Sequence, residues 1–256
     1  MRLDIYLHEH GFAESRARAK ALITSGCVYV NGKNTEKPSY EVSEETLNIE
    51  LRGDVCPYVS RGGLKLEGAL EAFSIALDGI TAADIGASTG GFTDCMLSRG
   101  AAKVYAIDCG TSQLHPKLRD DGRVVNIDNF NAREIDENTL PERCGIAVMD
   151  VSFISQRKLY ANVISLLCDD GAFISLIKPQ FEVGRGGVGK NGIVRDAALH
   201  KQAVRDCVSA AAAFNLILFG LVKSPIAGGD GNIEYLAYFR YKPTSAPPEV
   251  NINGVI

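Results

Sequence analysis

The sequence lacks the cysteine patterns that build disulfide frameworks or thiolate metal sites. Its cysteines are odd in number and scattered, and no two form a C-x-x-C pair: Cys27, Cys56, Cys95, Cys109, Cys144, Cys168 and Cys207. None of the four histidines stands at metal-ligand spacing from a cysteine. This distribution argues against a disulfide-rich secreted protein and against a zinc site. We therefore expect reduced thiols, a cytoplasmic location and no bound metal.

The sequence also lacks a hydrophobic run long enough to cross a bilayer. Its first residues, MRLDIYLHEHG, contain no apolar signal core. The longest apolar-rich stretch, residues 207–222, is interrupted by Ser209, Asn215 and Gly220, and it falls short of the roughly 20 residues that a membrane helix needs. We interpret this stretch as the end of a helix followed by a buried strand, and we expect no membrane partner.

Neither sign of charge is in large excess. The chain of 256 residues carries a formal net charge of -4, and 23% of its residues are charged. A protein that binds nucleic acid needs local basic surface rather than a basic total, so this balance neither supports nor excludes such a partner. With 46% hydrophobic residues, the chain is long enough for one medium-sized domain and one small one.

The N-terminal part of the sequence predicts two short helices followed by a β-hairpin. Gly11 can end the first helix, because glycine accepts the left-handed conformation. Ser15 can cap the second helix, residues 16–25. Asn31 and Gly32 form a strong hairpin signal. We place a small α+β domain at residues 1–58, ending in a linker, RGDVCPYVSRGG, whose proline and glycines break regular structure.

From Thr81 onward, short apolar runs alternate with helical patterns. This alternation predicts an α/β fold, a Rossmann-like sheet of seven strands covered by helices on both faces. The expected helices lie near residues 92–99, 112–119, 155–168 and 196–214, and the expected strands are AADIG, KVYAID, VVNI, IAVMD, AFISLIK, LILFGLV and EYLAYFRY. The last two strands are joined only by SPIAGGDGN, which is too short for a parallel crossover, so the final strand should run antiparallel. We assign residues 59–244 to this domain and expect a mobile tail at 245–256.

A glycine-rich loop and two acids together describe a pocket for an adenosine group. The loop ADIGASTGGF, residues 83–92, joins a strand to a helix at the sheet edge where open α/β folds bind ligands. Asp108 ends the next strand and can accept both hydroxyls of a ribose, and Asp128 ends the third strand. Gly86 is followed by Ala-Ser, which departs from G-x-G-x-x-G and disfavours NAD. A tight turn without a ligand is the alternative, and the two acids argue against it.

Four charged residues are expected near the same edge of the sheet. Lys65 lies on the helix after the linker, Asp150 and Lys178 each close an apolar strand, and Glu234 begins the last strand. A charge at such a position is costly unless it is paired or used. The four could form an ion-pair network that only ties the sheet together, or a catalytic group. Their expected gathering around one pocket favours the second interpretation.

Basic residues gather in two further places. The stretch VGRGGVGKNG, residues 183–192, imitates a phosphate-binding loop, but Asn191 replaces the Ser or Thr that would ligate magnesium, which disfavours an ATP-dependent enzyme. We interpret it as a mobile basic loop that places Arg185, Lys190 and Arg195 near phosphates. Near the N-terminus, five basic residues accompany a single acid: Arg16, Arg18, Lys20, Lys33 and Lys37. A solvated helix face is the alternative there.

Two stretches of the chain resemble known modules. Residues 2–38, from RLDIYL to NGKNTEKP, resemble the alpha-L RNA-binding domain of the ribosomal protein S-four type. Residues 59–242 resemble the FtsJ-like Rossmann methyltransferases. The fusion of the two, with VSRGGLKLEGAL, DIGASTGGFTDC, MDVSFIS and IKPQFE, resembles the TlyA (haemolysin A) family.

This resemblance implies an activity and a set of site residues. The implied reaction is S-adenosylmethionine-dependent methylation of the ribose 2′-hydroxyl of cytidine in ribosomal RNA. Large-subunit RNA is favoured because the chain begins directly at R-L-D. Lys65, Asp150, Lys178 and Glu234 map onto the catalytic K-D-K-E tetrad, with Lys178 as general base or as the cation that stabilises the developing oxyanion. Contacts to the methyl donor would come from Asp84, Gly86, Ser88, Gly90, Gly91, Phe92, Asp108, Asp128 and Asp150. Contacts to RNA would come from Arg16, Arg18, Lys20, Lys33, Arg61, Arg185 and Lys190.

Two other functions compete with this hypothesis. An RNA-binding ribosome assembly factor with a vestigial methyltransferase fold would also partner ribosomal RNA or ribosomal subunits. The intact acids and the complete tetrad argue against it, and a cofactor-binding titration would discriminate the two. A membrane-active toxin, as the older haemolysin label suggests, is opposed by the hydropathy of the chain.

Overall fold

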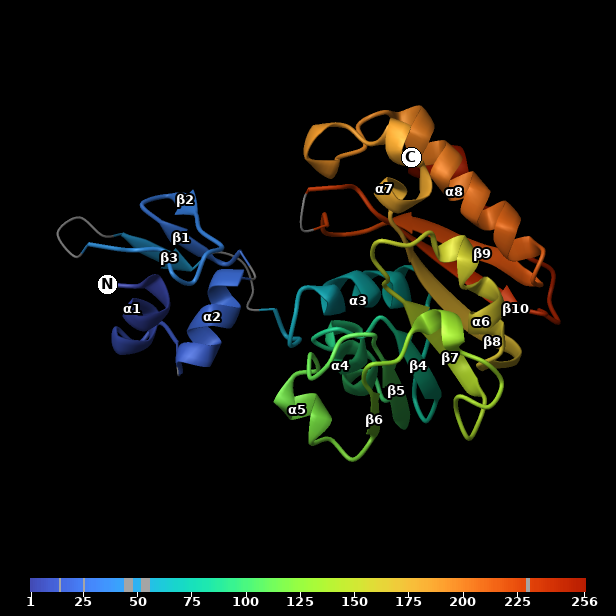
Figure 1. Cartoon of the computed structure of the whole chain (residues 1–256), viewed down its shortest axis with the longest axis horizontal. Coiled ribbons are helices and arrows are strands. Elements are labelled where there is room, and N and C mark those ends of the chain that lie inside the picture. The colour runs from blue at the N-terminus through green and yellow to red at the C-terminus, as the bar shows by residue number, and fades with distance from the viewer. Residues whose placement is uncertain (14, 25, 44–47, 52–55, 229–230) are drawn as a thin grey trace. The chain divides into compact units, whose positions relative to one another are not determined.

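The chain folds into two compact units, Met1–Arg61 and Gly62–Ile256 (Figure 1). The computed structural model describes residues 1–13, 15–24, 26–43, 48–51, 56–228 and 231–256, without the side chains of Arg185 and Lys190. The expected linker falls partly on residues 52–55, which lie outside the described residues. The sequence pattern places the domain boundary slightly earlier, at residue 58.

The N-terminal unit packs two helices against a small antiparallel sheet of strand order β2-β1-β3. Its elements are α1 (Leu3–Glu9), α2 (Arg16–Thr24), β1 (Val28–Val30), β2 (Lys33–Asn34) and β3 (Ile49–Leu51). Ser15 caps α2 as expected, since its Oγ accepts the N–H of Arg18. Asn31 and Gly32 have φ of 50° and 76°, so both adopt the left-handed conformation that a two-residue hairpin turn requires. Leu7 and Ile23 are fully buried in the core of this unit.

The C-terminal unit is built on a seven-stranded sheet of order β6-β5-β4-β7-β8-β10-β9 among the described residues. Only β10 runs antiparallel to its neighbours, β8 and β9, as the short connection before it predicts. The strands are β4 (Thr81–Ile85), β5 (Lys103–Ile107), β6 (Val124–Ile127), β7 (Cys144–Met149), β8 (Leu167–Ile177), β9 (Leu216–Lys223) and β10 (Tyr235–Tyr241). The predicted fold class is therefore confirmed.

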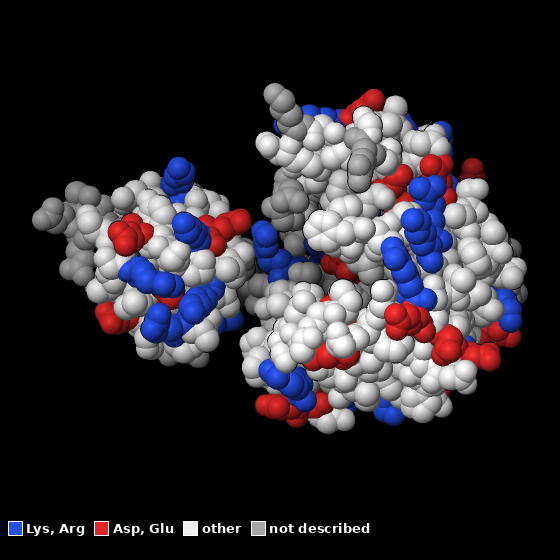
Figure 2. Space-filling model, viewed as in Figure 1, with Lys and Arg blue, Asp and Glu red and all other residues white. Residues whose placement is uncertain are grey.

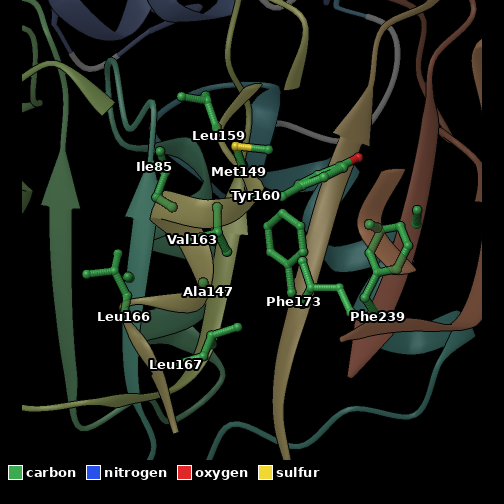
Figure 3. Close-up of a cluster of buried hydrophobic side chains, with 14 of the residues drawn as sticks. Ile85, Ala147, Met149, Leu159, Tyr160, Val163, Leu166, Leu167, Phe173 and Phe239 are labelled. Atoms are coloured by element: carbon green, nitrogen blue, oxygen red, sulfur yellow. The ribbon is translucent and has the colours of Figure 1, made fainter. Parts of the chain in front are cut away.

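Helices cover both faces of this sheet (Figure 1). The α-helices of the unit are α3 (Gly62–Ala72), α4 (Gly91–Ser98), α5 (Pro116–Arg119), α6 (Tyr160–Ile164), α7 (Pro179–Glu182), α8 (Ala197–Ala212) and α9 (Ile252–Val255). Side chains alternate across a strand, so Ile85 joins the core under α6 and α8 while Asp84 points to α4. Tyr160, Phe173 and Phe239 pack together at the centre of that core (Figure 3). The parallel strands β4, β5, β6, β7 and β8 consequently end at one shared edge.

Three segments differ from the sequence-based expectation. The helix predicted at 155–168 is a 3-10 turn, Gln156–Lys158, followed by the short α6, and residues 167–168 already belong to β8. The helix predicted at 112–119 begins only at Pro116, where His115 caps it. In the tail, where we expected mobility, Val250, Ile252, Val255 and Ile256 pack against the main core.

All seven cysteines are free thiols, in agreement with the absence of any paired spacing. No helix in the described part of the chain is both long enough and apolar enough to cross a membrane.

Candidate active site

Two ion pairs bring the four predicted charged residues together. Lys65 Nζ lies 2.6 Å from Glu234 Oε2, and Lys178 Nζ lies 2.6 Å from Asp150 Oδ1. The first pair joins α3 to the start of β10 and is buried, with 9% of Lys65 and 3% of Glu234 exposed. Lys178 and Glu234 line the same pocket, so the two pairs meet at one place. Their positions follow from the sheet, because Ile177 and Tyr235, the neighbours of Lys178 and Glu234, face each other on β8 and β10.

The pocket has a volume of about 290 Å³ and an aromatic entrance. Phe153 is 92% exposed and has a positive φ of 64°, an uncommon conformation for a bulky residue. Its ring centroid lies 5.4 Å from that of Phe181, at an interplanar angle of 52°. Lys178 Nζ stands 6.0 Å from the centroid of Phe181 and donates a hydrogen bond of 2.9 Å to Ser152 Oγ. The complete lining is Ser152, Phe153, Lys178, Gln180, Phe181, Val188, Gly192 and Glu234.

The sequence reasoning missed Ser152, Phe153 and Phe181 as site residues. A phenylalanine in a sequence is normally assigned to the hydrophobic core. Only the position of each phenylalanine relative to a catalytic residue could have indicated a role in the site. Phe153 follows Asp150 within MDVSF, and Phe181 follows Lys178 within KPQF, so each aromatic residue comes three positions after a predicted catalytic residue at a strand end.

The glycine loop packs directly against the strand end that carries Asp150. Gly86 has a φ of 84°, and a Cβ at this position would lie 2.4 Å from the main-chain oxygen of Asp150. Gly90 has a φ of 94°, and a Cβ there would lie 2.3 Å from Leu118. Only glycine satisfies both the conformation and the space at these two positions. The loop and the Lys178–Asp150 pair are therefore neighbours.

Of the two acids expected to hold an adenosine group, Asp108 stands beside this loop and Asp128 follows β6 further along the same sheet edge. Asp108 accepts the Ser88 N–H on Oδ2 at 2.9 Å and the Gly110 N–H on Oδ1 at 2.7 Å. Asp128 Oδ2 accepts the Ser112 N–H at 3.0 Å. A carboxylate has about four lone-pair sites, so both acids keep capacity to accept hydroxyl or amino protons of a ligand. The cradle made by Gly86 and Gly90, with the acids at its side, fits a nucleoside of the S-adenosylmethionine type.

Two of the predicted donor contacts, Asp84 and Phe92, are buried in the structure. Asp84 Oδ2 accepts a 2.6 Å hydrogen bond from Thr93 Oγ1, and its Oδ1 contacts no hydrogen-bond partner within the described residues. The pKa of Asp84 is raised to about 7, mainly by burial; the hydrogen bond from Thr93 opposes this shift, and the nearby charge of Asp150 contributes to it. Phe92 is 4% exposed, so its ring belongs to the core. Asp84 thus ties β4 to α4, the helix that follows the glycine loop.

The segment 183–192 does not adopt the strand–loop–helix arrangement of an ATP-binding P-loop. Its two 3-10 turns, Arg185–Gly187 and Lys190–Gly192, are not followed by a helix until Ala197. Val188 and Gly192 instead form one wall of the pocket. Asn232 fixes this wall, since its side chain donates to the Gly192 carbonyl at 3.0 Å and accepts the Val194 N–H at 3.1 Å.

The predicted RNA-binding residues have different surroundings. Arg18, Lys20 and Lys33 are exposed, and basic side chains gather on the visible face of the N-terminal unit (Figure 2). Arg16 lies 3.4 Å from the buried carboxylate of Asp4, so it also has a structural task. Arg61 lies 3.8 Å from Glu36 within the same unit. The side chains of Arg185 and Lys190 lie outside the described residues.

No group of three His, Cys, Asp or Glu side chains suited to a metal occurs in the described parts of either unit.

Comparison with known sequences identifies the modules that carry this geometry. The profile of the FtsJ-like methyltransferases matches residues 58–241. The chain belongs to the FtsJ-like methyltransferase family. The profile of the S4 domain matches residues 1–47, so an S4 domain precedes the methyltransferase domain in this chain. Both expected resemblances are confirmed.

Several relatives align with nearly the whole of this chain. "Hemolysin A" of Brachyspira hyodysenteriae is 44% identical and aligns with 93% of this chain and 99% of its own length. A protein of Mycobacterium tuberculosis named 16S/23S rRNA (cytidine-2'-O)-methyltransferase TlyA is 40% identical, over 93% of this chain and 89% of its own. A solved structure from Streptococcus thermophilus, named as a hemolysin, superposes with a TM-score of 0.77 and 39% identity, covering 100% of this chain and 94% of the other. This FtsJ-like chain therefore belongs with the TlyA and haemolysin A group.

Proposed function

We propose that the protein transfers a methyl group from S-adenosylmethionine to the ribose 2′-hydroxyl of a cytidine in ribosomal RNA. The observation that carries this proposal is the meeting of the Lys65–Glu234 and Lys178–Asp150 pairs at one pocket beside the glycine loop. The name of the M. tuberculosis relative supports the choice of ribosomal RNA and of cytidine. Action on ribosomal RNA would place the enzyme in the cytoplasm.

The methyl donor would lie in the cradle at Gly86 and Gly90. Asp108 would accept the ribose hydroxyls of the donor, and Asp128 would accept a proton from its base. When bound, the donor supplies a methyl group on a positively charged sulfur, which needs no further activation. The protein has two remaining tasks, to align the RNA hydroxyl with that methyl group and to manage the hydroxyl proton. Alignment alone can be worth roughly 7–11 kcal/mol.

Lys178 is the residue best placed for the hydroxyl proton. An amino group on a lysine side chain offers three directions for hydrogen bonds. Ser152 Oγ accepts one of them at 2.9 Å, and Asp150 Oδ1 lies 2.6 Å from the amino group as its ion-pair partner. A direction remains for the target hydroxyl, which Lys178 would bind either as an amine that takes the proton or as a cation that stabilises the developing oxyanion. Glu234, held by Lys65, would accept a hydrogen bond from the ribose on the opposite side of the pocket.

The aromatic pair at the pocket entrance suits a nucleobase. Phe153 is largely exposed, so its ring adds little to the stability of the fold. A base stacked on this ring would contribute about 1–3 kcal/mol to RNA binding. Such stacking would offset the few kcal/mol that unstacking a nucleotide from an RNA helix costs. Arg18, Lys20 and Lys33 on the N-terminal unit would add phosphate contacts elsewhere on the same RNA.

The test is methylation of purified ribosomal RNA, with the modified position mapped by mass analysis of fragments. Both subunit RNAs are offered separately, and the large-subunit RNA is tested first. Lys178→Ala should lower the rate at least about 100-fold, the usual contribution of a positioned acid–base group. Lys242→Ala is the matched control, because Lys242 lies just past the opposite end of β10 in a surface pair with Asp169 and should keep the wild-type rate. Wild-type activity in Lys178→Ala would refute the assignment.

A further inference from the structure

A buried carboxylate outside the two catalytic pairs connects the loops that form the pocket. Glu182 ends α7 and is 7% exposed. Its carboxylate accepts three hydrogen bonds, all from the loop that follows β7. The donors are Ser155 Oγ at 2.7 Å, the Gln156 N–H at 2.9 Å and Arg157 Nε at 3.1 Å. Three consecutive residues of one loop are thus bound to a single side chain of the other.

The same network is anchored on its far side. Arg157 compensates the buried charge of Glu182 and donates from Nη2 to the main-chain oxygen of Glu182 at 3.3 Å. The side-chain oxygen of Gln156, which is also buried, accepts a hydrogen bond from Ser175 Oγ on β8. Because a buried carboxylate costs several kcal/mol unless it is bonded, the three hydrogen bonds and the ion pair to Glu182 favour one conformation of the loop.

The loops joined in this way carry most of the pocket. The loop after β7 contributes Asp150, Ser152 and Phe153, and the segment after β8 contributes Lys178 and Phe181. Phe181 immediately precedes Glu182, and Phe153 lies two residues before Ser155. The network therefore involves residues adjacent in sequence to both aromatic residues, and it joins the two segments independently of the catalytic pair.

We propose that Glu182 is a positioning residue, which holds Phe153 and Ser152 at the right distance from Phe181 and Lys178 for the target nucleotide. The expected effect on RNA methylation rests on the proposed function. The expected effect on the conformation of the two loops rests on the geometry alone. Glu182 touches neither the RNA nor the methyl donor in this proposal. Its removal should impair the use of RNA while leaving donor binding, which depends on the ends of β4, β5 and β6, unchanged.

The kinetic experiment compares Glu182→Ala and the isosteric Glu182→Gln with the wild-type protein. At saturating donor, kcat/KM for ribosomal RNA should fall about 100-fold in Glu182→Ala, since a displacement of about 1 Å can cost that much. Donor affinity should stay within about twofold. Asp206→Asn is the control, because Asp206 lies 3.7 Å from Arg157 Nη1, whereas Arg157 binds Glu182 through Nε and Nη2, so Asp206 accepts none of the hydrogen bonds that join the two loops. This variant should keep the wild-type kcat/KM.

A double variant separates positioning from a general loss of stability. If Glu182 acts through the aromatic residue, Glu182→Gln combined with Phe153→Ala should lose little more activity than the worse single variant. Losses that multiply would overturn the proposal, and so would wild-type kinetics in both Glu182 variants. An inactive wild-type protein would refute the proposed function instead.

A spectroscopic experiment tests the positioning without any activity. The natural chain has no tryptophan, so Phe153→Trp introduces a single fluorophore at the pocket entrance. The anisotropy decay of this tryptophan should show a larger amplitude of fast local motion when Glu182→Ala is added, and no change when Asp206→Asn is added. Equal decays with and without Glu182→Ala would overturn the proposal.

Discussion

Asp84→Asn should make the protein more stable at neutral pH and leave its stability unchanged in acid. The Asp84 carboxyl is fully buried between β4 and α4, and burial is the main reason that its pKa rises to about 7. Asparagine has the same shape and can still accept the hydrogen bond from Thr93 Oγ1. The substitution therefore removes the ionisation of residue 84 while it preserves the packing of α4 on β4.

The magnitude follows from the difference between the folded and unfolded states. The pKa of Asp84 is about 7 in the folded protein against an ordinary value of 3.8. Each pKa unit corresponds to 1.36 kcal/mol, so the difference amounts to at most about 4 kcal/mol. A raised folded-state pKa means that the contribution of Asp84 to stability is complete below about pH 4 and is lost as the pH rises toward 7. Wild type and Asp84→Asn should thus be equally stable near pH 4 and differ by up to about 4 kcal/mol above pH 7.

The assay is urea unfolding of both proteins between pH 4 and pH 8, followed by subtraction of the two free energies at each pH. Groups that titrate alike in both proteins cancel in this difference. Asp120→Asn, at an exposed carboxylate after α5, is the control and should give a difference that does not vary with pH. A constant difference between wild type and Asp84→Asn, or a variant that is less stable at pH 8, would refute the reasoning.

Three further predictions concern the ligands and the geometry of the pocket. Asp108→Ala should weaken S-adenosylmethionine binding by about 10- to 100-fold in calorimetry, as expected for loss of hydrogen bonds to a charged group, with an unchanged circular dichroism spectrum. Gly228→Ala should lower kcat by about 10- to 100-fold with little change in donor affinity, because a Cβ there would lie 2.6 Å from Glu234 Oε1 and would displace that carboxylate. Lys20→Glu and Lys33→Glu should each weaken RNA binding and reduce the salt dependence of the affinity by about one released counterion, and an unaltered salt slope would exclude a phosphate contact.

Much of the fold could be predicted because its signals are local. The strand KVYAID is apolar and short, and its terminal Asp108 marks the place where burial ends. The direction of β10 followed from the length of one connection. Asp150, Lys178 and Glu234 could be located because charges at the ends of buried strands are rare without a partner, whereas Lys65 lies on the helix that follows the linker. Their pairing, Lys65 with Glu234 and Lys178 with Asp150, needed coordinates.

The parts that escaped prediction depend on contacts between distant segments. The pattern of residues 155–168 suits a helix, but Glu182 binds Ser155, Gln156 and Arg157 in a turn, and the Leu166 carbonyl accepts the N–H of Cys144 at the start of β7. These bonds outweigh a modest helical preference. The C-terminal residues carry proline and polar neighbours, yet Ile252 and Val255 pack on the core because the surface beside α8 and β9 offers them an apolar site.

The ion pair between Lys65 and Glu234 spans 169 positions of the chain. Lys65 belongs to the first helix of its unit and Glu234 precedes the last strand of the sheet, so one half of the pair is translated long before the other. Because β10 inserts between β8 and β9, a nascent chain that ends before β10 has neither a complete sheet nor a partner for Lys65. Competence for methyl transfer should accordingly arise only at the end of translation, so that shortened products from interrupted synthesis are inert toward the RNA of the ribosome that made them.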